Sequence, residues 1–158
     1  MRARSAWMAL VLLAGCAAPA RNIIGTKLPD SLENRAIVGA VERYRIAVEK
    51  GDVAALARMA SPNYWEDGGT PSAADDYGFA GLEKVLEGRF QKASAIRYSL
   101  RYQRVRRQEQ RAFVEVLVDA SYTVDSHRGE ERRDKRDQNE FVLEWDETTR
   151  QWRFLSGM

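Results

Sequence analysis

The sequence has only one cysteine, Cys16, and one histidine, His127, in 158 residues. A single cysteine excludes an intrachain disulfide framework, so the hydrophobic core must hold the fold by itself. One cysteine and one histidine also leave no cluster that could ligate a transition metal. A nucleophilic triad needs a histidine inside its site, whereas His127 stands in a turn predicted at residues 126–129. We therefore expect neither a metal site nor a triad.

The sequence also lacks the loops that usually bind phosphate groups or calcium. No glycine-rich stretch lies between a predicted strand and a predicted helix in the phosphate-cradling pattern. Four carboxylates between residues 66 and 76 do not follow the spacing of a calcium-binding loop, and they are Glu66, Asp67, Asp75 and Asp76. We therefore expect no cofactor, and the carboxylates are interpreted as a solvated loop over residues 66–78.

Neither basic nor acidic residues are in large excess, and the sequence has no long hydrophobic run. Arg2 and Arg4 account for two of the 25 basic residues, so without them 23 basic residues balance 23 acidic ones. A nearly neutral protein has no global attraction to nucleic acid. The apolar run over residues 6–14 is too short to span a bilayer as a permanent helix. It is instead typical of a secretory signal that follows a positively charged start.

The end of this signal carries the most specific motif in the chain. Leu13-Ala14-Gly15-Cys16 resembles the bacterial lipobox, in which the signal is cleaved before a lipidated cysteine. The resemblance implies that residues 1–15 are removed and that Cys16 anchors the protein to the lipid bilayer. Because Ala17 follows the cysteine, lipoprotein sorting rules imply the outer membrane, with the protein facing the periplasm. The alternative is a free thiol at the edge of an ordinary signal.

Removing the first 15 of 158 residues leaves 143, enough for one domain with a real core. Residues 16–29 are small, polar or Pro/Gly and predict a flexible tether. From residue 30 an apolar residue recurs every three or four positions, which predicts an amphipathic helix over 30–50. Asp30 would cap this helix and Glu33 would complete a capping box. The inward positions are Ile37, Ala40, Val41, Tyr44, Ala47 and Val48.

The rest of the chain predicts two more helices and then a sheet. Gly51 suits the left-handed residue that ends a helix, and Asp52 suits the cap of a short helix over 52–59. A third helix is expected over 79–93. From Ile96 the apolar period changes to two, which predicts strands joined by short turns. The longest alternating set runs from Ala112 to Val124 and predicts the central strand. Helices first and an antiparallel meander afterwards indicate an α+β domain over residues 30–158.

The order of these elements resembles the nuclear transport factor 2-like superfamily, which includes polyketide-cyclase-like proteins and ketosteroid isomerases. The resemblance rests on Glu42-Arg43-Tyr44, Gly51-Asp52, Leu56, Glu66-Asp67 and a closing Trp-x-Phe strand. It implies a cone-shaped fold in which three N-terminal helices pack in a strongly bent antiparallel sheet. It also implies a pocket at the open end of the cone. Fold alone does not establish function, because members of this group have unrelated roles.

The ketosteroid isomerases suggest which residues could act. In them a Tyr on the first helix donates to a developing oxyanion and an Asp past the first strand moves the proton. Tyr44 and Asp67 hold the matching places in this sequence. A second acidic donor on a late strand is replaced here by Asn139 or Phe141. The alternative is that Tyr44 is a core aromatic and Asp67 a turn residue.

We expect a non-catalytic lipoprotein whose cone binds a small apolar ligand or a protein partner. The ligand-binding residues would be Trp65, Tyr98, Asn139 and Phe141. One alternative is an isomerase or cyclase that uses Asp67 as general base and Tyr44 as hydrogen-bond donor. Another is an assembly protein that forms a homodimer through the outward face of the sheet, with the cone filled.

The region of residues 97–111 is rich in arginine. Cross-strand ion pairs would explain this composition, and contact with anionic lipid headgroups is the alternative. Nucleic acid is not an expected partner, because tyrosines and arginines alternate to opposite faces. The arginines are Arg97, Arg101, Arg104, Arg106, Arg107 and Arg111.

Overall fold

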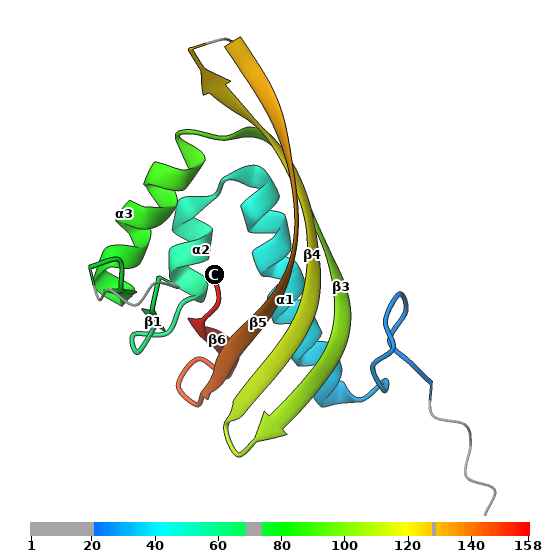
Figure 1. Cartoon of the computed structure of the whole chain (residues 1–158). Helices are drawn as coiled ribbons and strands as arrows, with labels where there is room; N and C mark the ends of the chain where they lie inside the picture. Colours follow the sequence, from blue (N-terminus) through cyan, green and yellow to red (C-terminus); the bar gives the residue numbers. More distant parts are fainter. Residues whose placement is uncertain (1–20, 69–73, 128) are drawn as a thin grey trace, which may run out of the picture.

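The computed structural model describes residues 21–68, 74–127 and 129–158. The chain folds as three helices and a curled antiparallel sheet, which confirms the predicted α+β cone (Figure 1). The helices are α1 (Leu32–Lys50), α2 (Val53–Met59) and α3 (Phe79–Phe90). The main sheet has the order β3-β4-β5-β6, with bounds β3 (Ser94–Gln108), β4 (Arg111–Ser126), β5 (Gly129–Asp146) and β6 (Gln151–Ser156).

The ends of α1 show how local chemistry sets the helix. Ser31 is the N-cap and its side chain accepts a hydrogen bond from the Asn34 amide. The prediction that Asp30 caps this helix is wrong, because Asp30 instead forms an ion pair with Arg35. That pair lowers the pKa of the Asp30 carboxyl. At the other end Gly51 has φ +62° and its amide donates to α1 carbonyls, as its left-handed conformation requires.

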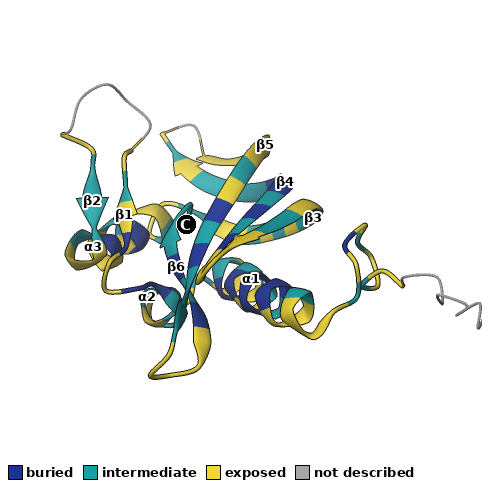
Figure 2. Cartoon of the chain, turned by 90° about the horizontal axis from the view of Figure 1, so that it is seen from below, coloured by how far each residue is buried: buried dark blue, intermediate teal, exposed yellow. Residues whose placement is uncertain are grey.

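The core lies between α1 and the concave face of the sheet (Figure 1). Along β4 the residues alternate between buried and half-exposed from Ala112 to Ala120, visible as stripes in Figure 2. Ile37 and Val41 of α1 are fully buried in the same cluster as Val114 of β4. The predicted packing of the first helix under the central strand is therefore confirmed. The β4–β5 hairpin continues beyond the helices, so part of its inner face is left uncovered (Figure 1).

Two short elements differ from the sequence prediction. The brief strand that the sequence predicts over residues 64–65 is β1 (Trp65–Glu66), one residue later. It pairs with β2 (Tyr77–Gly78), which lies at the end of the predicted loop. Helix α3 ends at Phe90, three residues before the predicted end. Helix α2 starts at Val53 as its Asp52 cap predicts, with the Asp52 carboxylate accepting from the Ala55 amide at 2.9 Å.

The start of the chain is described only from residue 21, so the signal peptide and Cys16 lie outside the described residues. Residues 21–29, part of the predicted tether, form a closed turn with a bridge between Asn22 and Pro29. Leu28 in this turn is 4% exposed and belongs to the core. The folded part therefore begins earlier than residue 30. Among the helices of the described residues, none has the length and hydropathy of a membrane span.

Candidate functional site

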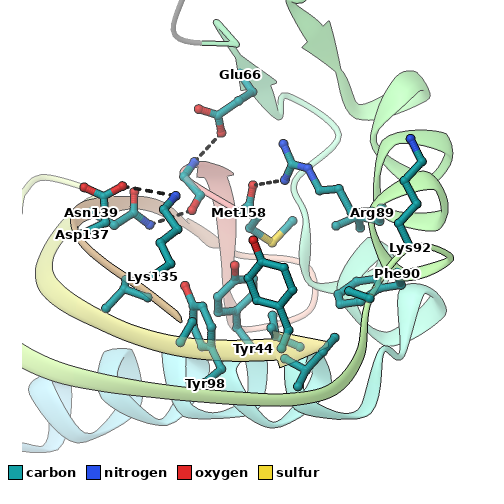
Figure 3. Close-up of a pocket in the computed structure, with 18 of the residues that line it drawn as sticks. Tyr44, Glu66, Arg89, Phe90, Lys92, Tyr98, Lys135, Asp137, Asn139 and Met158 are labelled. Carbon is teal, nitrogen blue, oxygen red and sulfur yellow. Dashed lines mark hydrogen bonds and ion pairs between the residues drawn. The ribbon is translucent and has the colours of Figure 1, made fainter. Parts of the chain in front are cut away.

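A cavity of about 800 Å³ opens where the β4–β5 hairpin passes beyond α1 (Figure 3). Its volume lies within the range of small-molecule sites, roughly 300–1,000 Å³. Helix α1, helix α3 and strands β3, β4 and β5 supply the walls, with the end of the chain on one side. The walls are largely apolar and include Val48, Leu86, Phe90, Val118, Ala120 and Val124.

The floor of the cavity is built on aromatic rings. Tyr44 of α1 lies edge-on to Phe141 of β5 at 5.1 Å between ring centroids, and its ring is 5.2 Å from that of Phe154. Phe141 and Phe154 also contact each other edge-on at 5.6 Å. These contacts hold the Tyr44 ring in place, and its hydroxyl points toward the cavity in Figure 3. Burial raises the pKa of the Tyr44 hydroxyl, and the adjacent Tyr98 raises it further. Burial also raises the pKa of the Tyr98 hydroxyl.

Charged side chains of β5 lie along one wall. Lys135 and Asp137 share the inner face of β5 and form an ion pair at 3.2 Å. This hydrogen bond from Lys135 lowers the pKa of the Asp137 carboxyl. Asn139 is the next inward residue, and its amide nitrogen donates to the Gly157 carbonyl at 2.8 Å. The polar groups of β5 are therefore largely engaged with each other and with the chain end.

The end of the chain continues this wall beside β5, and Glu66 fixes it. The carboxylate oxygen Glu66 Oε2 accepts from the Gly157 amide at 2.7 Å and from the Tyr64 hydroxyl at 2.8 Å. Arg89 of α3 donates to the Met158 backbone oxygen at 3.3 Å (Figure 3). The Met158 side chain is buried. Glu66 therefore has a structural role that keeps this wall of the cavity closed.

The structure brings four of the six predicted pocket residues to one cavity. Tyr44 and Tyr98 lie at its floor, Asn139 on its wall, and Asp67 at its exposed rim. Trp65 is 57% exposed and lies outside the lining, because it turns away on β1 and covers Gly78.

Phe141 also lies outside the lining. It is 0% exposed because α1 covers it, so it supports Tyr44 from below. The expected cavity lining is therefore wrong at Trp65 and at Phe141, while the roles of the residues in binding or catalysis stay predictions.

Sequence reasoning missed Glu66, Arg89 and Lys135 as parts of this site. Lys135 could have been found, because the alternation that places Phe141 inward also places every second residue before it inward. Glu66 and Arg89 gave no such signal, since each depends on the path of the chain end through Gly157 and Met158.

Two residues of the arginine-rich region, Arg104 and Arg106, form cross-strand pairs of the predicted kind. Arg104 lies 3.4 Å from Glu115 of the neighbouring strand. Arg106 lies 3.6 Å from Glu115 and 3.0 Å from Glu140, so it joins three strands. The groups are partly exposed, and each such pair contributes little to stability. Within the described residues, no group of three histidine, cysteine, aspartate or glutamate side chains is placed to hold a metal ion.

No protein-family model matches the sequence, and no curated protein matches it at a significant level. Solved structures do match. A ketosteroid isomerase-like protein from Erwinia carotovora atroseptica is similar with a TM-score of 0.64 and 19% identity, over 80% of this chain and 93% of that one. A candidate dehydratase of the NTF2-like family from Streptomyces avermitilis has a TM-score of 0.60 and 14% identity, over 78% and 92%. This chain has the nuclear transport factor 2-like fold.

The nuclear transport factor 2-like fold explains the position of the cavity but not its chemistry. A candidate scytalone dehydratase from Novosphingobium aromaticivorans is also similar, with a TM-score of 0.63 and 17% identity over 78% of this chain and 79% of that one. A conserved protein from Planctomyces limnophilus shares the fold as well, at a TM-score of 0.62 and 15% identity over 78% of this chain and 91% of that one. Since one fold serves several roles, the function of this chain has to be argued from its own residues.

Proposed function

We propose that this protein is a lipoprotein, anchored in the outer membrane through Cys16 and facing the periplasm, whose cavity binds a small apolar ligand without turnover. The anchor is supported by the lipobox-like Leu13-Ala14-Gly15-Cys16 behind an apolar run. Mass spectrometry of the mature amino terminus tests it. We expect a diacylated or triacylated Cys16, and an unmodified thiol or a retained signal would contradict it.

The single observation that carries the binding role is an open, largely apolar cavity at the end of the cone. Its side chains from Val48, Val118 and Ala120 present apolar surface that would be removed from water by a ligand. Burial of apolar surface contributes roughly 25 cal/mol per Å². On the β5 wall, Lys135 and Asp137 are already paired with each other. A ligand would therefore be held mainly by shape and apolar contact. The assembly role requires a filled cone, and the cavity volume of about 800 Å³ argues against it.

Titration with the neutral fluorescent probe N-phenyl-1-naphthylamine tests this binding role. We expect saturable binding to the full chain and a loss of at least tenfold in affinity for Ala120→Phe, which places a ring in the cavity. Ala36→Phe is the matched control, because Ala36 is an exposed residue of α1 outside the cavity. Equal binding by both variants would overturn the proposal.

The second candidate function is an isomerase or dehydratase activity at the same cavity. It is favoured by one observation, that Tyr44 and Asp67 both line this cavity. In this role Tyr44 donates a hydrogen bond to the oxygen on which negative charge develops, and Asp67 moves the proton. Turnover of a β,γ-unsaturated ketone that is lost in Asp67→Asn and in Tyr44→Phe, with probe binding retained, would establish it. Absence of turnover in the unaltered protein leaves the binding role.

A further inference from the structure

A second cavity, of about 600 Å³, lies away from the first, between the helices and the last strand. Residues from α1, α2, the start of α3, β6 and the turn before β6 line it. Three of its lining residues are arginines, namely Arg43, Arg58 and Arg153, and none of the described residues that line it is acidic. The first cavity differs, because both acidic and basic residues line it. The second cavity therefore has a positive charge that its own walls do not balance.

The arginines of this cavity are not equivalent. Arg153 is fixed, because its Nε lies 2.8 Å from Asp146 and its Nη1 lies 3.3 Å from the Ala60 carbonyl oxygen. Arg43 and Arg58 are exposed, and neither forms an ion pair with any residue in the described ranges. Two guanidinium groups are therefore free to bind an anion beside a third that is held in position. A guanidinium binds carboxylate and phosphate oxygens through paired hydrogen bonds.

The other side of this cavity is apolar. Trp152 and Phe154 of β6 form its base and are 8% and 0% exposed, respectively. Met59 of α2 is half-buried, and Phe79 at the start of α3 is 43% exposed. Apolar surface of this kind beside unpaired arginines matches a ligand with an apolar body and one charged end.

We infer that this second cavity binds a small amphipathic oxyanion, with its carboxylate or phosphate on Arg43 and Arg58 and its apolar part on Met59, Phe79 and Trp152. The volume of about 600 Å³ admits a ring system or a short alkyl chain. This site is separate from the ligand cavity of the proposed function, since the two share no lining residue. It does not depend on the proposed function being correct.

Tryptophan fluorescence reports on this cavity directly. Trp152 lines it and contacts Trp145 edge-on at 5.5 Å between ring centroids. The full chain is therefore prepared with Trp7→Phe and Trp65→Phe, so that Trp145 and Trp152 supply the emission. The probes are octanoate, octyl phosphate, octanol and inorganic phosphate. We expect a saturable change of tryptophan emission with octanoate or octyl phosphate, and an affinity at least tenfold higher than for octanol or inorganic phosphate. Comparison of octanoate with octyl phosphate distinguishes a carboxylate ligand from a phosphate ligand.

Variants assign the binding to this cavity. We expect the double variant Arg43→Gln, Arg58→Gln to weaken octanoate or octyl phosphate binding at least tenfold. The matched control is Arg97→Gln, Arg101→Gln, which removes two exposed arginines of β3 outside both cavities and should leave affinity unchanged. Equal affinity for octanol and octanoate, or equal loss in both double variants, would overturn the inference.

A third variant separates this site from the first cavity. Ala120→Phe fills the first cavity and lines no part of the second. It should not change the tryptophan signal with octanoate or octyl phosphate, although it weakens binding of the neutral probe at least tenfold if the proposed function is correct. Loss of the tryptophan signal in Ala120→Phe would show that the anionic probes enter the first cavity, and the second site would be refuted.

Discussion

Replacing Phe141 by leucine tests whether this residue supports the cavity floor from below. The change removes two edge-on ring contacts, with Tyr44 at 5.1 Å and with Phe154 at 5.6 Å. Aromatic pairs contribute about 0.5–1.5 kcal/mol each beyond their buried area, so we expect a loss of about 2 kcal/mol. In a domain of this size that lowers Tm by about 8 °C. Phe113→Leu is the control, since the one aromatic or cation–π contact of the Phe113 ring within the described residues is with Arg106, at 5.0 Å. Such a contact is worth about 0.5–1 kcal/mol.

The assay combines thermal unfolding with probe binding. Phe141→Leu should lower Tm clearly more than Phe113→Leu, because Phe141 is 0% exposed and supports the Tyr44 ring. Affinity for N-phenyl-1-naphthylamine should change less than threefold, because Phe141 does not line the cavity. Unchanged stability together with a tenfold loss of affinity would refute this reasoning and would restore Phe141 as a ligand contact.

Three further predictions concern the backbone and one carboxylate. Gly157→Ala should destabilise by about 1–3 kcal/mol in urea unfolding, because Gly157 has φ +93° and an added Cβ would lie 2.5 Å from the Glu140 carbonyl oxygen; no loss would contradict this geometry. Gly88→Ala should stabilise α3 by about 0.5–1 kcal/mol, since an added Cβ meets nothing within 4 Å; a loss in the same assay would show a contact at this position. Thr149 donates to Asp146 and lowers the pKa of the Asp146 carboxyl below the usual 3.8. The free energy of unfolding of the protein should therefore exceed that of Asp146→Asn by a constant amount above about pH 5, and this difference should shrink as acid protonates the native carboxylate. A difference in unfolding free energy that grows in acid would contradict the sign of this shift.

Long periodic segments allowed the sequence to predict most of the fold. The three-and-four spacing that includes Ile37 and Val41 predicts a helix with one buried face, and both residues are fully buried. The alternation from Ala112 to Val124 predicts the strand that lies between β3 and β5. Tertiary packing selects these patterns because each buries one continuous apolar face.

Short or competing signals explain what the sequence did not predict. Ser31 and Asp30 are both residue types that cap helices well. Asp30 forms an ion pair with Arg35, and Ser31 caps α1 instead. A two-residue strand such as β1 carries no period, so the outward direction of Trp65 could not be found.

Phe141 is inward on β5, but alternation cannot say whether a helix covers an inward residue. Cavity lining depends on where α1 stops covering the sheet, and this is a property of the whole fold.

The most direct test of the central claim is to locate a bound neutral probe by methyl NMR. The account predicts that N-phenyl-1-naphthylamine shows intermolecular contacts with methyl groups of Val48, Val118 and Ala120, which line the cavity. Leu143, which is 0% exposed and lines neither cavity, should show none. Contacts that are absent from the first three residues, or that are found only on the outer face of the sheet, would contradict the claim that the cone is a binding site.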